Sequence, residues 1–202
     1  PLLRFMNKEA IKNTALRTIV MEGKAILDLQ PFIDDNFLKA VSALAACKSR
    51  LIVSGIGKSA IIAQKIVATF NSTGTPALFM HAADAIHGDL GMVQAGDVVV
   101  IISKSGESPE IKVLVQLIKN FGNKVIGIVG NIDSYLAKQS DFVLNTTVSQ
   151  EACPNNLAPT SSTTAQMVMG DALAVALMEK RGFNTADFAK FHPGGDLGKK
   201  LY

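Results

Sequence analysis

Short apolar runs alternate with helical patterns through the middle of the chain, and this alternation restricts its fold more than any other feature. The runs are apolar on both faces, which is typical of strands covered by helices on both sides. Strand and helix in strict succession predict parallel pairing with right-handed crossovers. We therefore predict an α/β fold, a doubly wound five-stranded parallel sheet flanked by helices. The five expected strands are 51–54, 77–80, 98–103, 125–129 and 142–144.

Helical patterns also lie before and after this alternating region. Apolar residues recur at helical spacing through 7–29 and again through 34–47, ahead of the first strand. This N-terminal helical segment is expected to fold back on the domain or to pack against a partner subunit. A long helix is expected from Ser161 to about Arg181, after an irregular loop.

The glycine-rich tail 191–198 cannot form a regular element. No linker divides the chain, so residues 1–202 are interpreted as one domain, with 1–48 as its helical segment and 49–202 as its core.

Composition excludes several classes of protein. With 48% hydrophobic and 18% charged residues the chain is globular, and its net charge of +3 forms no basic stripe for a nucleic acid. Cys47 and Cys153 make no CxxC motif and no disulfide framework, so we expect free thiols in a reducing compartment. No run approaches 18 apolar residues. We expect a cytoplasmic protein that binds neither nucleic acid nor membrane.

Three hydroxyls gather around a glycine where the third expected strand ends. Ser103, Ser105 and Ser108 stand directly before a helical pattern. Hydroxyls and free backbone N–H groups at such a turn suit a phosphate. In doubly wound sheets, ligands bind beyond the carboxyl ends of the strands, where Ser54 also lies. The sequence therefore predicts a site for a small phosphorylated molecule.

The same serines have a simpler interpretation. Ser108 could cap the following helix, with Glu107 or Glu110 in its first turn. Capping needs one hydroxyl, however, and this stretch has three, so ligand binding is favoured.

A second glycine turn, Gly55 to Ala60, follows the first expected strand. It fits a loose dinucleotide fingerprint, but the second strand ends in Met80 and His81, without the acidic residue that a ribose requires. A P-loop would need glycine where Ile52 stands. Both nucleotide interpretations fail on these requirements. A tight turn near an anion remains, with Lys58 as a contact to phosphate or hydroxyl or simply as an exposed lysine.

Three histidines and one loop glutamate complete the candidates. His81, His87 and His192 show no metal-ligand spacing, and we predict no metal site. His87 lies near a strand end and His192 in the glycine-rich tail, where filling of the core is a poor explanation. Glu151 stands beside Cys153, and a lone glutamate in a loop is usually solvated. A cysteine nucleophile would need a base that the sequence cannot place.

Several stretches across roughly residues 50 to 200 match one known family. They are Gly55–Ser59, Thr69–Pro76, His87–Met92, Ile102–Glu110, Glu151–Gly170 and His192–Gly195. The chain resembles the sugar isomerase (SIS) domain family and, more narrowly, its D-arabinose 5-phosphate isomerases.

This resemblance implies an aldose–ketose isomerase that interconverts D-ribulose 5-phosphate and D-arabinose 5-phosphate through a cis-enediol. The product would enter Kdo and lipopolysaccharide biosynthesis, and no cofactor is expected. The implied assembly is a homotetramer that shares its sites between subunits, and an acidic sugar could occupy the same anion pocket as a feedback ligand. The implied phosphate- and substrate-binding residues are Ser54, Gly57, Ser59, Ser103, Ser105, Ser108 and Thr160. The implied catalytic residues are Lys58, Glu110, Glu151, His192 and His87.

Either His192 or Glu151 could be the base that moves the proton between C1 and C2. A base works best with a pKa near the working pH, which histidine has and which glutamate reaches only through burial. We favour His192, with Glu151 as partner or competing base.

The chain departs from the family pattern at a few positions. Lys104 replaces an asparagine, Ala60 a glycine and Asp196 a small residue. Larger relatives carry two regulatory CBS repeats beyond this point, and we expect none within 1–202. Two alternatives stay open: a non-catalytic sugar-phosphate sensor, although 1–50 shows no helix-turn-helix, and an SIS isomerase for another sugar phosphate.

Overall fold

All of the strands expected from the sequence form one parallel sheet. The computed structural model describes residues 7–195 and 199, so Asp196 and the two residues after it in the expected irregular tail lie outside the described residues. The strands are β1 (Leu51–Gly55), β2 (Ala77–His81), β3 (Val98–Ser103), β4 (Lys124–Val129) and β5 (Phe142–Asn145). They pair in the order β2-β1-β3-β4-β5, and every pair is parallel. The predicted α/β class is therefore confirmed.

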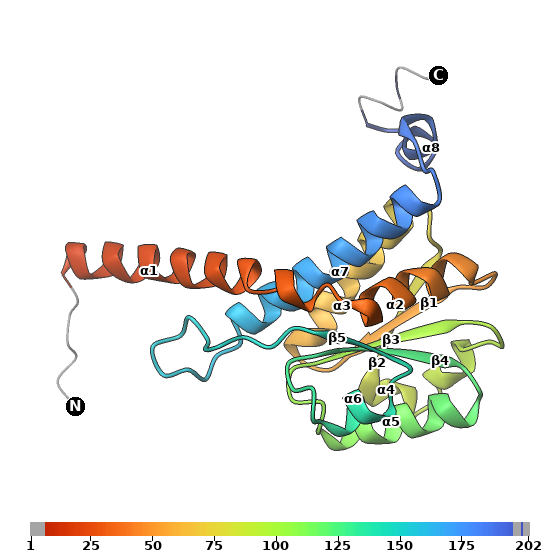
Figure 1. Cartoon of the computed structure of the whole chain (residues 1–202), viewed down its shortest axis with the longest axis horizontal. Coiled ribbons are helices and arrows are strands. Elements are labelled where there is room, and N and C mark those ends of the chain that lie inside the picture. The colour runs from red at the N-terminus through yellow and green to blue at the C-terminus, as the bar shows by residue number, and fades with distance from the viewer. Residues whose placement is uncertain (1–6, 196–198, 200–202) are drawn as a thin grey trace.

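Helices cover both faces of the sheet, as fully buried strands require (Figure 1). One face packs against α2 (Asp35–Ala46), α3 (Lys58–Ser72) and α7 (Ser161–Lys180). The other packs against α4 (Ala82–Ala85), α5 (Pro109–Asn120) and α6 (Tyr135–Gln139).

Side chains alternate along each strand between these two cores. Val53 and Val100 lie in the first, whereas Ile52 and Ile101 lie in the second. The sheet is thus closed to water on both faces, and a ligand can reach it only at an edge.

The N-terminal helix α1 (Lys8–Leu27) is covered by the domain only near its C-terminal end. Asn7 caps it, and the first buried side chain along it is Ala25. Thr164 of α7 donates a 2.6 Å hydrogen bond to Glu22, whereas the earlier turns project away from the sheet (Figure 1). Large apolar side chains remain exposed on the helix, namely Ile11, Leu16, Ile19, Val20 and Leu27.

A short helix follows α7 that the sequence interpretation did not anticipate. Helix α7 ends before Gly182, whose φ of 66° is the left-handed conformation that stops helices. Helix α8 (Thr185–Phe191) then begins with a capping box between Asn184 and Asp187. The 3-10 turns are η1 (Gln30–Phe32) and η2 (Asp89–Met92).

The structure also bears on the expectations for the cysteines and for membrane-spanning helices. Both cysteines are free. Within residues 7–195 and 199, no helix combines the length and the apolar character that crossing a bilayer requires.

Candidate functional site

The C-terminal ends of the strands and the segments that follow them form one edge of the sheet, called here the carboxyl edge. Ser54 is the last residue but one of β1, and Ser103 ends β3, its neighbour in the sheet. Both side chains are buried, with exposed fractions of 0% and 6%. Because parallel strands bring their C-terminal ends together, two serines far apart in the sequence stand at adjacent positions of the same edge.

The loop from Ser103 to Ser108, called here the serine loop, folds on its own hydroxyls. Ser103 Oγ accepts a hydrogen bond from Gly106 N at 3.0 Å, and Ser105 Oγ accepts one from Glu107 N at 3.3 Å. Gly106 has φ 66°, and a Cβ at this position would collide with Ser134, so only glycine fits the turn. The loop is therefore a fixed platform at the start of α5.

Ser108 occupies the N-cap position of α5 but does not cap it through its side chain. Its Oγ is buried and has no hydrogen-bond partner in the described chain, and the cap shows no side-chain hydrogen bond. The simple capping interpretation is therefore wrong for this hydroxyl. Ser108 remains available to a ligand at the N-terminus of a helix, where backbone N–H groups favour an anion.

The two glutamates of this stretch take different positions. Glu107 accepts a 2.6 Å hydrogen bond from Tyr135 N and pairs with Lys112 at 2.6 Å, and these contacts lower its pKa. It thus fastens the serine loop to α6. Glu110 lies half-buried in the first turn of α5, at the carboxyl edge.

Buried polar atoms without a partner concentrate at this edge. Within residues 7–195 and 199, six buried side-chain atoms lack a hydrogen-bond partner, and each belongs to a residue at a C-terminal strand end or at the helix start after one. Buried polar groups nearly always have a partner, so a cluster of exceptions marks a place where a bound ligand or water can supply the missing hydrogen bonds. The atoms belong to Ser54, His81, Ser108, Thr146, Ser161 and Ser162.

Sequence reasoning missed part of this lining. The sequence predicts a helix from Ser161 and no site residue in its first turn, but the N-cap of α7 is Thr160, and Ser161 and Ser162 are buried at the carboxyl edge. A cap needs one hydroxyl, so the run itself was a usable signal. Thr146, directly after β5, carries no signal in the sequence.

Glu151 is buried at the same edge, with an exposed fraction of 1%, so the expectation of a solvated loop glutamate is wrong. Lys104 Nζ lies 2.7 Å from its Oε1, and its Oε2 accepts hydrogen bonds from Thr160 N at 2.8 Å and Ser162 N at 3.1 Å. Burial alone would raise the pKa of this carboxyl, but these donors outweigh it and lower the pKa to about 2. Glu151 is therefore a fixed carboxylate at any physiological pH.

Thr160 supports this carboxylate. Its Oγ1 lies 3.2 Å from Glu151 Oε2 and accepts a 2.8 Å hydrogen bond from Ala152 N. Thr160, which is a predicted substrate-binding residue, therefore makes hydrogen bonds to Glu151 and Ala152 within the protein itself.

The turn after β1 places three further candidates at the carboxyl edge. Gly57, with φ 59°, is the N-cap of α3 and is followed by the exposed Lys58. Ser59 Oγ donates a 3.1 Å hydrogen bond to Gln166 of α7. His87 is exposed in the segment that follows β2.

His192 is the one predicted site residue that lies elsewhere in the described chain. It caps the C-terminus of α8, beyond the end of α7 that is remote from the carboxyl edge (Figure 1). Phe191, beside it, stacks on Phe183 at 6.0 Å between ring centroids. Within one chain, His192 is therefore separated from the serines by the length of α7, which at 20 residues spans about 30 Å.

The ring of His192 is nevertheless held in a defined state. It stacks on Phe188 at 3.8 Å between centroids, and Nδ1 lies 2.8 Å from the Phe188 carbonyl oxygen. A carbonyl oxygen only accepts, so Nδ1 carries a proton, and in the neutral ring the lone pair is on Nε2. This tautomer leaves Nε2 free to accept a proton.

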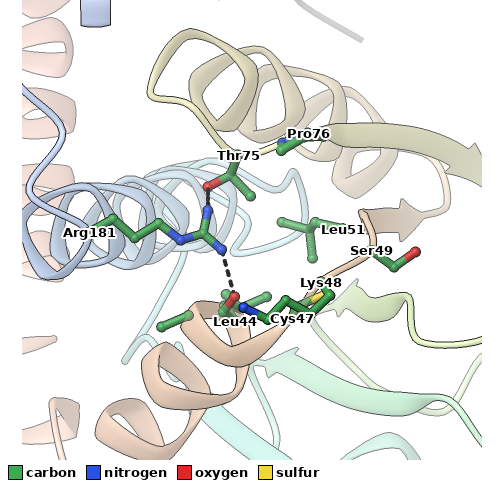
Figure 2. Close-up of a pocket in the computed structure, with 9 residues that line it drawn as sticks. Leu44, Cys47, Lys48, Ser49, Leu51, Thr75, Pro76 and Arg181 are labelled. Atoms are coloured by element: carbon green, nitrogen blue, oxygen red, sulfur yellow. Dashed lines mark hydrogen bonds between the residues drawn. The ribbon is translucent and has the colours of Figure 1, made fainter.

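A hollow of about 420 Å³ opens at the opposite edge of the sheet (Figure 2). Arg181 lies across it and donates 2.8 Å hydrogen bonds to Thr75 Oγ1 and to the Leu44 carbonyl oxygen. These contacts join the end of α7 to the segments before β2 and β1, so the arginine has a structural role. Residues 7–195 and 199 contain no group of three or more His, Cys, Asp or Glu side chains that could hold a metal ion.

A buried parallel sheet with hydroxyls and helix starts at its carboxyl edge has the arrangement in which doubly wound folds bind anionic ligands. Residues 44–176 match the SIS domain family, and the chain belongs to that family.

Curated relatives support a narrower comparison. The arabinose 5-phosphate isomerase KdsD of Pseudomonas aeruginosa is 51% identical over 189 residues, which cover 94% of this chain and 58% of the relative. KdsD of Escherichia coli K12 is 50% identical over 183 residues, covering 91% of this chain and 56% of the relative. The chain thus spans little more than half the length of these relatives.

A solved structure also resembles the whole described fold. It is a protein of Escherichia coli CFT073 in complex with arabinose 5-phosphate, 40% identical, with a TM-score of 0.87 and coverage of 93% of this chain and all of that one. The family and the fold are therefore both confirmed.

Proposed function

We propose that this protein is an aldose–ketose isomerase that interconverts D-ribulose 5-phosphate and D-arabinose 5-phosphate. The observation that carries the proposal is the set of buried, unpartnered hydroxyls at the carboxyl edge, joined by the serine loop and two helix N-termini. Relatives about half identical to this chain are named for this reaction, and a similar structure is described with arabinose 5-phosphate bound. The product would supply Kdo and lipopolysaccharide biosynthesis in the cytoplasm.

The serine loop is the natural grip for the phosphate. Ser54 and Ser108 offer unpartnered hydroxyls, and the start of α5 adds free N–H groups with a positive dipole end. Phosphate is remote from the reacting carbons, so its binding free energy can position C1 and C2 for reaction. In this proposal the hydroxyls bind, and other groups carry out the chemistry.

Isomerisation moves one proton between C2 and C1 and shifts charge onto the substrate oxygens. The ammonium group of Lys58, at the start of α3, would stabilise that developing negative charge, and Glu110 would bind sugar hydroxyls. Glu151 has a pKa of about 2, which makes it a weak base. His192, with a free lone pair on Nε2, is the stronger candidate for the base.

For His192 to act, it must reach the serine loop from another subunit. We therefore propose a homotetramer that shares its active sites, in line with the position of α8 at the far end of α7. The exposed apolar side chains of α1 offer surface for such an assembly.

Incubation with ribulose 5-phosphate in deuterated water, with a chelator present, tests the reaction. An enediol route predicts an aldopentose 5-phosphate with deuterium at C2, detected by NMR and mass spectrometry. The absence of both turnover and exchange would overturn the proposed activity and leave a sugar-phosphate sensor. Efficient conversion of a hexulose phosphate instead would indicate another isomerase of the family.

A further inference from the structure

Lys104 links two distant parts of the carboxyl edge. It stands in the serine loop, between Ser103 and Ser105, and its Nζ lies 2.7 Å from Oε1 of Glu151, which precedes α7. The side chain of Lys104 is 48% exposed, whereas that of Glu151 is 0% exposed. A solvent-facing cation thus reaches inward to a carboxylate that water cannot reach.

The two oxygens of Glu151 are satisfied in different ways. Oε2 accepts hydrogen bonds from Thr160 N, Thr160 Oγ1 and Ser162 N, which all belong to the start of α7. Oε1 accepts only from Lys104 among the described residues. Removal of the ammonium group would therefore leave one oxygen of a buried carboxylate without a donor.

The backbone of Lys104 is fixed, so its side chain is aimed rather than merely adjacent. Its carbonyl oxygen accepts a 3.1 Å hydrogen bond from Gly130 N at the end of β4. A Cβ on Gly130 would lie 2.8 Å from that oxygen, so the approach requires glycine.

We propose that Lys104 is a positioning residue that joins the serine loop to the start of α7 and keeps Glu151 in its ionised form. The role of this pair in turnover rests on the proposed isomerase function, whereas the pair itself does not. In this arrangement Glu151 supplies a permanent negative charge beside the substrate, and the proton transfer belongs to another group.

The proposal predicts how Glu151 titrates when Lys104 is removed. The charged group in contact with Glu151 is Lys104 from the serine loop, whereas Glu22 of α1 contacts α7 further along, at Thr164. Without Lys104, only the donors at the start of α7 would oppose the effect of burial, so the pKa of Glu151 rises. Glu151 would then take up its proton at a higher pH than in the wild type.

The test uses Lys104→Met, Lys104→Arg and, as a matched control, Lys124→Met at the other edge of the sheet, where the lysine is exposed. Unfolding is measured in urea from pH 8 to pH 4, without substrate. We expect Lys104→Met to be less stable than wild type at pH 8, with the difference shrinking as the pH falls and Glu151 takes up its proton. Lys104→Arg and Lys124→Met should match wild type.

The second measurement is the pH dependence of kcat/KM for ribulose 5-phosphate. In Lys104→Met the acid limb should steepen and move to higher pH, because protonation of Glu151 now adds to protonation of the base. Lys104→Arg should keep the wild-type profile, and a loss of stability alone would not move this limb.

If Lys104→Met does not fold, Lys104→Met combined with Glu151→Gln removes both charges and should restore folding. A stability difference that is independent of pH, or a double variant that stays unfolded, would overturn the proposal. An unshifted acid limb in an active Lys104→Met enzyme would do the same. If the wild-type protein does not turn over ribulose 5-phosphate, the proposed function fails. The unfolding experiments would still show whether Lys104 keeps Glu151 ionised.

Discussion

The two edges of the sheet differ in whether the protein itself supplies hydrogen bonds to their buried polar groups. At the edge where the strands begin, Asp97 is 1% exposed and accepts hydrogen bonds from Ser49 Oγ, from Arg50 N at 3.0 Å and from Gln94 N at 2.8 Å. Asn123 donates to the carbonyl oxygens of Gln94 and Asp97, both at 2.9 Å. This edge is saturated by the protein itself.

At the carboxyl edge, buried atoms such as Ser54 Oγ and Ser161 Oγ have no partner in the described chain. A saturated network stabilises the fold, whereas an unsatisfied one costs stability until a ligand supplies the missing bonds. The comparison teaches that stability and recognition are assigned to opposite ends of the same strands.

The largest effect is expected for His192, the predicted catalytic residue that does not lie at the carboxyl edge. His192→Ala should lower kcat by roughly 10³-fold, because general-base catalysis contributes about 10²–10⁴-fold. Binding of ribulose 5-phosphate, measured by calorimetry, should survive.

Mixing this variant with Glu110→Gln tests the donation of His192 between subunits. If each site takes its histidine from a neighbour, subunit exchange should restore about a quarter of the wild-type sites. Normal turnover by His192→Ala would reject the assignment, and unrestored activity in the mixture would place histidine and glutamate in one subunit.

Asp97→Asn probes the saturated edge. The change disrupts a buried network and leaves Arg50 without its charged partner at 3.0 Å, so we expect a loss of about 3 kcal/mol in the free energy of unfolding. The refolded enzyme should keep its kcat/KM at temperatures well below its melting point. A fall in kcat/KM with unchanged stability would contradict the division between the edges.

Ser108→Ala probes the open edge and should give the reverse result. Its Oγ makes no hydrogen bond within the described protein, so stability should change by less than about 0.5 kcal/mol. Loss of a bond to phosphate should raise KM about tenfold. Ser72→Ala, at the C-terminal end of α3, is a suitable control, and equal KM values for both variants would argue against phosphate binding by Ser108.

The smallest effect is the acid dependence of stability. Asp97 and Glu151 both have a lowered pKa in the fold: Asp97 lies below its ordinary 3.8 because donors from Ser49, Gln94 and Arg50 outweigh burial, and Glu151 lies at about 2. Groups of this kind contribute stability above their unfolded pKa, and this stability is lost as the pH falls toward the folded value. We expect a flat profile from pH 8 to pH 5 and a decline below about pH 4.5. In Asp97→Asn that decline should be shallower, as urea titrations at each pH would show.

The sheet could be predicted because its signals are local. Residues 98–103 are apolar on both faces, and a helical pattern follows directly, so strand and crossover can be inferred within one window. The serines at the ends of β1 and β3 came together for the same reason, since parallel order alone brings strand ends to one edge. Helix α8 was missed although its capping box was visible at Asn184 and Asp187.

The burial of Glu151 could not be predicted, because it depends on contacts distant in the sequence. Its partner Lys104 is 47 residues away, and the sequence contains no pattern that pairs them. The position of His192 depends in the same way on how α7 crosses the domain. Contacts between residues distant in the sequence, rather than local structural preference, therefore determine which candidate site residues lie close together.

The projecting part of α1 has a consequence for how this helix behaves in water. Its turns before Met21 contribute no buried side chain, and a helical segment with few tertiary contacts is only marginally stable alone. Fraying of these turns should therefore compete with any association that covers Leu16, Ile19 and Val20. Amide protons of residues 8–20 should exchange quickly in dilute solution and slowly at high protein concentration, so that order in this helix becomes a gauge of self-association.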